Sequence, residues 1–283
     1  MIPASHIKKT IDFNTRFRNL LEVLKLVAVQ QYYALEAHLK TFGRLEEVLE
    51  QFFDSIDVSG VNHPFLQASG KPAGVIAVTS DAGLLGGMNL QVMSKALELV
   101  AEENGRLVIV GEKGQGYAKD FGVPFTSYPG VSDANRYRQA MEIRDEMIRD
   151  VVQGRLGAVK VVYSRALSFV IHRVEAETLI PFTGPAVEKK TGASAYSKDV
   201  ILESSPAEVL EYLVYLTTGK RIYEIFGMSR LAEQAARFTH LEESCQKILD
   251  MNKKLTLQYF RRRHEMIDQN MRELFASRSV YAK

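Results

Sequence analysis

The chain has 283 residues, of which 46% are hydrophobic and 25% charged, a composition typical of a folded globular protein that excludes a disordered one. The 36 basic and 34 acidic residues leave a net charge of +2, so composition carries no sign of nucleic-acid binding. The one cysteine, Cys245, excludes an intrachain disulfide framework and suits a reducing compartment. No apolar run approaches the roughly 18 residues of a membrane span, so we expect the chain to meet a membrane only through a partner.

The N-terminal region, residues 1–58, predicts one long helix. No proline lies between Pro3 and Pro64, and an interior proline would break a helix. Apolar residues recur on a three-and-four spacing over seven heptads, interrupted mainly by Asn14. The seam consists of Ile7, Ile11, Phe17, Leu21, Leu24, Ala28, Tyr32, Leu35, Leu39, Phe42, Leu45, Leu49, Phe52 and Ile56.

Residues 59–205 follow a different pattern, which predicts an α/β domain with a mostly parallel, Rossmann-like sheet. The apolar runs AGVIAVT, RLVIVG and AVKVVYS are typical of buried strands. They alternate with helical stretches at 88–104 and 133–153. We expect the polar loop 183–198 to be exposed.

Residues 206–283 predict a second long helix, since no proline follows Pro206. The segment SPAE marks its start, with Ser205 as the cap, Pro206 at the first position and Glu208 completing a capping box. Asn252 interrupts the apolar seam of this helix. The seam residues are Leu231, Phe238, Leu241, Cys245, Ile248, Leu255, Tyr259 and Met266.

The lengths of the two helices predict how they are arranged. At 1.5 Å per residue the first would span about 80 Å and the second about 110 Å, whereas a compact domain of this size has a radius of gyration of about 19 Å. We therefore expect an antiparallel coiled coil of projecting helices (1–58 and 206–283) flanking the central α/β domain (59–205). The C-terminal helix would overhang its partner by roughly 30 Å. The alternative is that glycines break these runs into shorter bundle helices: Gly43, Gly219 and Gly227.

The stretch TSDAGLLGGMN, Thr79 to Asn89, lies between a predicted strand and a predicted helix. A glycine-rich turn in that position can hold a phosphate with backbone N–H groups and the helix dipole. Its glycines match neither G-x-G-x-x-G nor a P-loop, and no lysine follows them; Lys113, in VGEKGQG, lies in a second such turn. Glycines also permit tight backbone geometry. We therefore favour a structural turn and keep a nucleotide site as the alternative.

No catalytic constellation stands out from the surface charges. The six histidines show no metal-binding spacing such as H-E-x-x-H. Cys245 lies on the helix seam, which suits a small buried residue better than a nucleophile. No Ser–His–Asp order or pair of carboxylates is distinctive. We therefore predict no catalytic residue, no metal and no cofactor.

A basic segment distinguishes the C-terminal helix. Between Lys247 and Arg263 six basic residues face one acidic residue, whereas residues 1–58 hold seven basic and eight acidic residues. A charge run is commonly a solvated face, but here it precedes apolar residues that have no intrachain partner, and such surface implies a partner. We predict a basic collar and an apolar tip that contact partner subunits: Lys253, Lys254, Arg261, Arg262, Arg263, Ile267, Met271 and Phe275.

These motifs together resemble the gamma subunit of the rotary F-type ATP synthase, over the whole length and in the same order. The glycine-rich stretch is similar to the signature T-S-D-x-G-L-C-G-G-x-N, with Leu85 in place of the common cysteine. The matching residues are Thr79, Ser80, Asp81, Gly83, Leu84, Gly86, Gly87 and Asn89. Other similar segments are VIVGEKG (108–114), LIPF (179–182), ESSPAEVLEYL (203–213), EQAARF (233–238) and LTLQYFRRRH (255–264).

The resemblance implies a mechanical role without catalysis. The shaft of that family turns inside a ring of three alpha and three beta subunits, and the beta subunits carry the chemistry. Its globular foot contacts the membrane rotor ring of c-type subunits and an epsilon subunit. We therefore expect a peripheral membrane protein on the cytoplasmic side of a bacterial inner membrane, with protons or sodium as the coupling ion.

The C-terminal tip departs from the family pattern. The family motif R-Q-x-x-I-T-x-E-L is here RHEMIDQNM, so His264, Asp268 and Asn270 replace Gln, Thr and Glu. Phe260 replaces Asn, and LEVL (21–24) replaces T-K-A-M. These positions face the catalytic ring in the family. Two alternatives therefore stay open: a gamma-like coiled-coil scaffold without rotary coupling, and a nucleotide-binding α/β protein with a coiled-coil arm.

Overall fold

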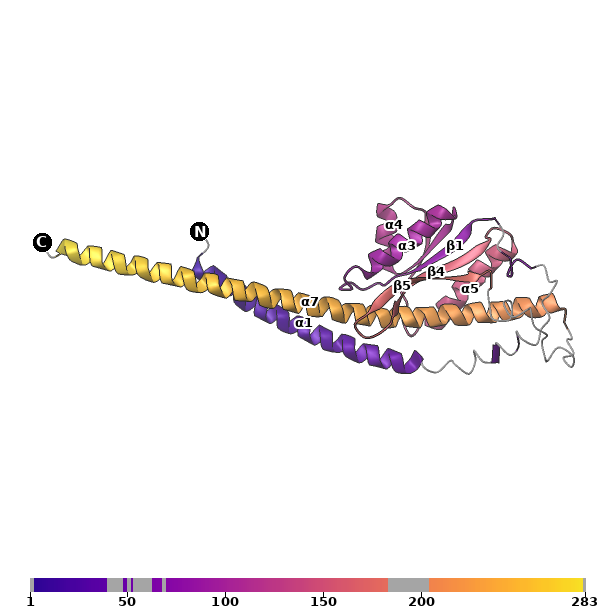
Figure 1. Cartoon of the computed structure of the whole chain (residues 1–283), viewed down its shortest axis with the longest axis horizontal. Coiled ribbons are helices and arrows are strands. Elements are labelled where there is room, and N and C mark those ends of the chain that lie inside the picture. The colour runs from indigo at the N-terminus through magenta and orange to yellow at the C-terminus, as the bar shows by residue number, and fades with distance from the viewer. Residues whose placement is uncertain are drawn as a thin grey trace. The chain divides into compact units, whose positions relative to one another are not determined.

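The computed structural model describes residues 3–39, 48, 49, 52, 63–67, 70–182 and 204–281. By compactness the chain divides into two units, which we call the sheet unit and the coil unit. The sheet unit is Gln30–Arg237, and the coil unit is Met1–Val29 together with Phe238–Lys283. Two helices, α1 (Ala4–Leu39) and α7 (Pro206–Tyr281), contribute residues to both units (Figure 1).

A five-stranded sheet forms the centre of the sheet unit, in the order β3-β2-β1-β4-β5. β1 pairs parallel with β2 and with β4, and β2 pairs parallel with β3. β5 pairs antiparallel with β4 at one edge. The expected α/β class with a mostly parallel sheet is thereby confirmed. The strands are β1 (Ala73–Val78), β2 (Arg106–Val110), β3 (Phe125–Tyr128), β4 (Ala158–Ala166) and β5 (His172–Ile180).

Helices cover both faces of this sheet, which explains the apolar runs in its central strands. All six residues of β1 are buried. On one face Val75 and Leu107 pack with residues of α3 (Met88–Glu102) and α4 (Glu112–Asp120). On the other face Ile76 and Val108 pack with α5 (Arg136–Val152) and with the first part of α7 (Figure 1).

Among the described residues, the sequence predicted three of the five strands and two of the three shorter helices. β1, β2, β4, α3 and α5 are confirmed, with ends that differ by at most three residues. β3, β5 and α4 were missed. β5 alternates charged and apolar residues because it is an edge strand, and α4 contains two glycines that lower its intrinsic helix propensity. The loop 183–198 lies outside the described residues.

The coil unit is an antiparallel pair formed by α1 and α7. Lys25 forms an ion pair with Glu242 at 2.6 Å, and Asn14 donates a hydrogen bond to Asn252 at 2.9 Å. Residues with higher numbers in α1 contact residues with lower numbers in α7, so the two helices are antiparallel, as the sequence predicted. Between these levels Leu21 packs against α7 in a buried apolar cluster.

The start of α7 agrees with the sequence. α7 begins at Pro206. The amide of Glu208 donates to Ser205 Oγ at 3.3 Å, and the amide of Ser205 donates to Glu208 Oε2 at 3.1 Å, which is the expected capping box. Gly219 and Gly227 lie inside this continuous helix, so the alternative that they break it is wrong. Gly43 lies outside the described residues.

The extent of the N-terminal helix is described only in part. α1 runs to Leu39, residues 48, 49 and 52 are also helical, and the other residues from 40 to 62 lie outside the description. The predicted boundaries at 58/59 and 205/206 follow secondary structure and stay a prediction. Packing divides the chain differently, because the last turns of α1 and the first part of α7 belong to the sheet unit.

Candidate functional site

The glycine-rich turn is closed by its own side chains. Asn89, in the first turn of α3, accepts a hydrogen bond from the Ser80 amide at 3.2 Å and donates one to Ser80 Oγ at 2.9 Å. Gly86 has φ of 60°, a left-handed conformation that glycine adopts without strain. A Cβ at Gly83 would meet no atom within 4 Å, and one at Gly87 would meet only Gln91, at 3.9 Å. Hydrogen bonds between Ser80 and Asn89 therefore close the turn, and of its three glycines only Gly86 has a backbone conformation that favours glycine.

The carboxylate of Asp81 occupies the position in which an anion would bind at the start of α4. Its Oδ1 accepts hydrogen bonds from the Glu112 amide at 2.8 Å and from the Gly130 amide at 3.0 Å. Thr79 Oγ1 accepts a further bond from the Gly114 amide at 3.1 Å. A Cβ on Gly130 would lie 2.4 Å from the Asp81 carboxyl, so only glycine fits there.

These contacts favour a structural role for the turn. A phosphate at the start of α4 would meet the negative charge of Asp81 and would compete for amides that are already bonded. The cavity beside the turn has a volume of about 120 Å³, well below the roughly 300–1,000 Å³ of small-molecule sites. The lysine of the second turn, Lys113, donates its amide to the Ser80 carbonyl at 3.0 Å, which ties the two turns together.

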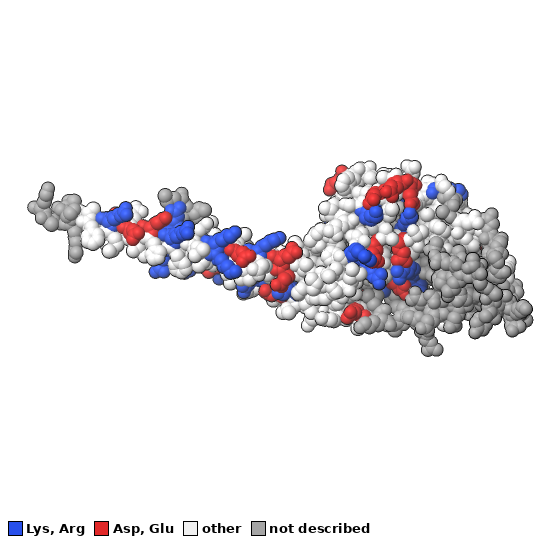
Figure 2. Space-filling model, in the orientation of Figure 1, with Lys and Arg blue, Asp and Glu red and all other residues white. Residues whose placement is uncertain are grey.

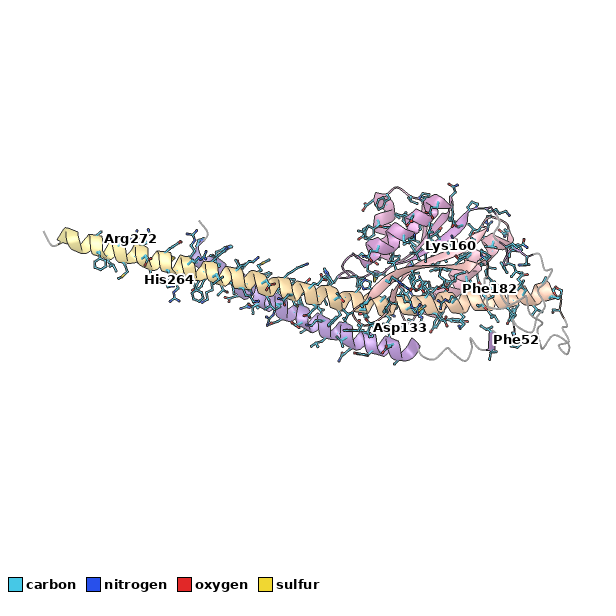
Figure 3. The ribbon with its side chains drawn as sticks, in the orientation of Figure 1. Phe52, Asp133, Lys160, Phe182, His264 and Arg272 are labelled. Atoms are coloured by element: carbon cyan, nitrogen blue, oxygen red, sulfur yellow. The ribbon has the colours of Figure 1, made fainter. Side chains whose placement is uncertain are left out.

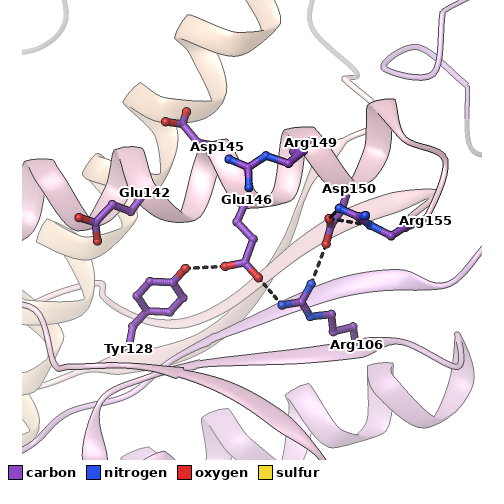
Figure 4. Close-up of a pocket in the computed structure, with 8 residues that line it drawn as sticks. All are labelled: Arg106, Tyr128, Glu142, Asp145, Glu146, Arg149, Asp150 and Arg155. Carbon is purple, nitrogen blue, oxygen red and sulfur yellow. Dashed lines mark hydrogen bonds and ion pairs between the residues drawn. The ribbon is translucent and has the colours of Figure 1, made fainter.

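A larger polar cavity of about 470 Å³ lies where α5 crosses β2 and β3 (Figure 4). Arg106 forms ion pairs with Glu146 and with Asp150, and Asp150 also pairs with Arg155. Burial, and then the neighbouring Glu146 carboxylate, raises the pKa of Tyr128, so its hydroxyl stays protonated and bonds to Glu146. The lining residues are Arg106, Tyr128, Glu142, Asp145, Glu146, Arg149, Asp150 and Arg155. This network of ion pairs and hydrogen bonds links β2 and β3 to α5, and its positive and negative charges largely neutralise one another.

The described part of the chain contains no group of three or more His, Cys, Asp or Glu side chains that could hold a metal ion. None of its helices is long and apolar enough to cross a membrane. Cys245 is buried against Leu21 and Leu241, and burial raises the pKa of its thiol. As the sequence indicated, Cys245 is a small seam residue.

The predicted collar and tip lie on the last turns of α7. From Arg263 to Ala276 every residue is exposed, and Figure 3 shows the side chains of His264 and Arg272 pointing out from the helix. Lys253 pairs with Asp250 at 3.2 Å and Arg262 with Glu265 at 2.6 Å. Two of the basic side chains of the collar are therefore paired with carboxylates, and Figure 2 shows acidic side chains interspersed among the basic ones. Tip residues Ile267, Met271 and Phe275 are 46%, 49% and 65% exposed.

α1 carries a second apolar face that the sequence pattern did not separate from the seam. Phe17, which we predicted as a seam residue, is 43% exposed and stacks on Phe13 with ring centroids 6.1 Å apart, so that prediction is wrong. The signal was present in FNTRFRNLLEVLKLVAV, which holds more apolar positions than one seam uses. The exposed apolar residues of this outer face are Phe13, Phe17, Leu20, Val23, Leu26 and Val27.

The described residues form a helix pair with exposed apolar and basic surface and an α/β unit whose glycine-rich turn is satisfied internally. The family model described as ATP synthase matches residues 4–279. The chain belongs to the ATP synthase family.

Curated relatives are consistent with the resemblance that the sequence indicated. The ATP synthase gamma chain of Chlorobaculum tepidum is 29% identical over 245 residues, which cover 83% of this chain and 82% of the relative. The ATP synthase gamma chain of Moorella thermoacetica is 26% identical over 278 residues, which cover 95% and 96%. The resemblance to gamma subunits is therefore confirmed.

Solved structures share the fold at low sequence identity. A chain of the OSCP/F1/c-ring assembly of Euglena gracilis mitochondrial ATP synthase matches with a TM-score of 0.68 at 13% identity, covering 98% of this chain and 94% of that chain. A chain of the central stalk and c-ring of Tetrahymena thermophila mitochondrial ATP synthase matches with a TM-score of 0.60 at 19% identity, covering 79% and 98%. At these identities the likeness concerns the fold alone.

Proposed function

We propose that this chain is the central-stalk rotor shaft of an F-type ATP synthase, which transmits torque between the membrane rotor ring and the catalytic ring during ATP synthesis or hydrolysis. The observation that carries the proposal is its similarity, over nearly the whole chain, to proteins named ATP synthase gamma chain. A solved structure with the same fold is part of an F1/c-ring assembly, which supports the same role.

The long helix α7 suits a shaft. It is a single helix of 76 residues with parts in both compact units, so force applied to the sheet unit passes into the coil unit along one hydrogen-bonded backbone. In the coil unit, the Asn14–Asn252 hydrogen bond favours one axial register of the helix pair. A pair with one register transmits force better than one that slides.

The exposed surfaces of the helices suit a surrounding ring. The basic collar, Lys253, Lys254 and Arg261–Arg263, would meet acidic loops of the alpha and beta subunits. The tip residues Ile267, Met271 and Phe275, together with the outer face of α1, would enter an apolar sleeve. The sheet unit, with its turn at 79–89, would contact an epsilon-type subunit and the c-type subunits of the membrane ring.

In this role the chain has no catalytic residue and no cofactor of its own, because the beta subunits carry the chemistry. It binds no nucleic acid and reaches the membrane only through its partners. The curated relatives named above come from bacteria, so we place the chain on the cytoplasmic side of a bacterial inner membrane as a peripheral protein. The coupling ion is a proton or sodium.

The second candidate is a gamma-like scaffold that has lost rotary coupling. It is favoured by the changed tip positions, Phe260, His264, Asp268 and Asn270, all of which are exposed. Partner loops that changed along with them would preserve coupling. A scaffold would assemble with the same subunits yet would not drive ion movement.

Purification from solubilised membranes through a tag on this chain tests the proposal. We expect alpha, beta and epsilon-type subunits and the c ring to co-purify, and the complex to pump ions in vesicles when ATP is added. Recovery of the chain only as a free soluble protein would refute both candidates. ATP hydrolysis by a complete complex without pumping would favour the scaffold. Calorimetry of the full chain with ADP, ATP and NAD tests the nucleotide-binding alternative, for which we expect no heat of binding.

A further inference from the structure

Two buried arginines of α5 stack on two tyrosines of α7 within the sheet unit. The guanidinium carbon of Arg136 lies 3.8 Å from the ring centre of Tyr223, and that of Arg144 lies 3.6 Å from the ring centre of Tyr215. The two arginines are only 6% and 7% exposed. The two arginines are eight positions apart on α5 and the two tyrosines eight positions apart on α7. The two arginine–tyrosine contacts are therefore about 12 Å apart along antiparallel helices. α5 and α7 are therefore joined at two levels by the same kind of contact.

Between these two levels the side chains of Arg144 and Met141 on α5 lie against Gly219 of α7. A Cβ on Gly219 would lie 2.8 Å from Arg144 Nη1 and 3.0 Å from Met141 Cε. The residue that faces this level on α5, Ala140, is fully buried. Glycine in a helix interior is otherwise unfavourable, so its presence here is explained by the close packing that it allows.

The opposite side of α7 is held by β5. Arg221 donates to both oxygens of Glu177, from Nε at 2.5 Å and from Nη2 at 2.7 Å. Arg221 follows Gly219 by two residues, which places it about 200° around the helix. Within a single turn, α7 is therefore fixed on one side to α5 and on the other to the sheet.

These contacts are directional, unlike the apolar contacts around them. A guanidinium must lie over the ring face to gain the cation–π attraction, and a bidentate arginine–carboxylate pair requires a fixed geometry. Arg136 Nε donates a hydrogen bond to the Tyr223 carbonyl at 2.9 Å, and the Tyr223 ring covers the guanidinium group, whose buried Nη2 makes no hydrogen bond to any described residue. Rotation or sliding of α7 would break the Arg221–Glu177 ion pair and would remove the tyrosine rings from the two buried guanidinium groups.

We propose that this set of residues, the α7 clamp, is the element through which torque passes between the sheet unit and α7. The clamp consists of Arg136, Arg144, Glu177, Tyr215, Arg221 and Tyr223. It rests on the proposed rotor function and adds the residues that make the shaft turn together with its sheet unit. They are positioning residues, because the reaction takes place in other subunits.

The test measures ions pumped per ATP hydrolysed by the purified complex in vesicles, with the chain in wild-type form or as Tyr215→Leu/Tyr223→Leu. The leucine variant keeps apolar packing and loses both ring faces. We expect ATP hydrolysis to persist while ions pumped per ATP fall by roughly fivefold or more. Tyr215→Phe/Tyr223→Phe keeps both ring faces, loses the hydrogen bond that Arg144 Nη2 donates to the Tyr215 hydroxyl, and should pump as the wild type does. Arg138→Lys/Tyr212→Leu is the matched control, because Arg138 and Tyr212 lie exposed on the same two helices.

The outcomes separate this proposal from the rotor function itself. A wild-type complex that hydrolyses ATP without pumping refutes the rotor function, whatever the variants do. A wild-type complex that pumps, beside a leucine variant that pumps equally well per ATP, overturns the clamp. Arg136→Lys/Arg144→Lys, which keeps both charges and loses the planar stack, is the second variant if the first does not assemble. If neither variant assembles, the clamp serves folding and the proposal is also overturned.

Discussion

The hydrogen-bonded pair Asn14 and Asn252 allows a quantitative test of how the coil unit keeps its register. Asn14 Nδ2 donates to Asn252 Oδ1 at 2.9 Å, and Asn252 Nδ2 in turn donates to Thr15 Oγ1 at 3.3 Å. Asn14 is 9% exposed. The perturbation is replacement of each asparagine by leucine, singly and together.

The expected magnitudes follow from which groups lose their partners. Asn252→Leu leaves the amide of the buried Asn14 without this partner, and an unsatisfied buried polar group costs about 1–3 kcal/mol. Asn14→Leu costs less, because Asn252 is half-buried and keeps its hydrogen bond to Thr15. The double replacement removes both amides and buries two apolar side chains, each worth about 1.5–3 kcal/mol when fully buried. We therefore expect the double variant to be more stable than the sum of the single variants predicts, by about 1–2 kcal/mol.

Thermal unfolding of the full chain, followed by helical circular dichroism, measures this coupling. One kcal/mol corresponds to about 2–4 °C for a chain of this size. Asn270→Leu is the control, because Asn270 lies exposed on the same helix and should leave the midpoint unchanged. Additivity of the two single variants to within about 0.3–0.5 kcal/mol would refute the reasoning, since it would mean that the two amides do not depend on each other.

Three further changes have defined outcomes. Asp81→Ala leaves the amides of Glu112 and Gly130 without their acceptor and should lower the unfolding free energy by about 1–3 kcal/mol in a denaturant titration, whereas equal stability would contradict the anchoring role. Burial lowers the pKa of His172, so the unfolded chain binds a proton more readily than the folded chain, and stability should fall as the pH drops through about 6.5. His172→Gln should make the unfolding midpoint less dependent on pH between about pH 7 and 5. An unchanged pH dependence would exclude His172 as its cause. Replacing Arg261–Arg263 by alanine should reduce ATP synthesis by the assembled complex, and unchanged synthesis would speak against a coupling role of the collar.

Several elements could be predicted because their signals are local. The start of α7 is encoded in SPAE, where the capping residues and the proline lie within four positions. β1 is buried along its whole length and β2 and β4 along most of theirs, so each strand contains an apolar run that the sequence shows. The edge strand β5 was missed because its one solvated face removes that signal.

The role of the glycine-rich turn could be predicted only in part. Its position after a strand was evident, but the partners of Asp81 lie 31 and 49 residues further along the chain. No local pattern announces that a carboxylate fills the anion position of α4. The three-dimensional fold was needed to show that Asp81 and Asn89, more than the glycines, hold the turn.

The same limit applies to pairing along the helices. The sequence identified Asn14 and Asn252 as separate interruptions of two seams, and only the antiparallel register shows that they are partners. Arg136 and Tyr223 are 87 residues apart, and neither belongs to a motif. Heptad spacing also did not distinguish the seam from the outer face of α1, because both faces are apolar.

Direct observation of rotation tests the central claim, that this chain is a turning shaft. Cys245 is 2% exposed, so a cysteine introduced at the exposed Lys119 of the sheet unit would carry a visible probe selectively. The complex would be fixed to a surface through its alpha and beta subunits and supplied with ATP. We predict continuous rotation of the probe in one direction, with a speed that follows the rate of hydrolysis. A stationary probe on complexes that hydrolyse ATP would contradict the claim.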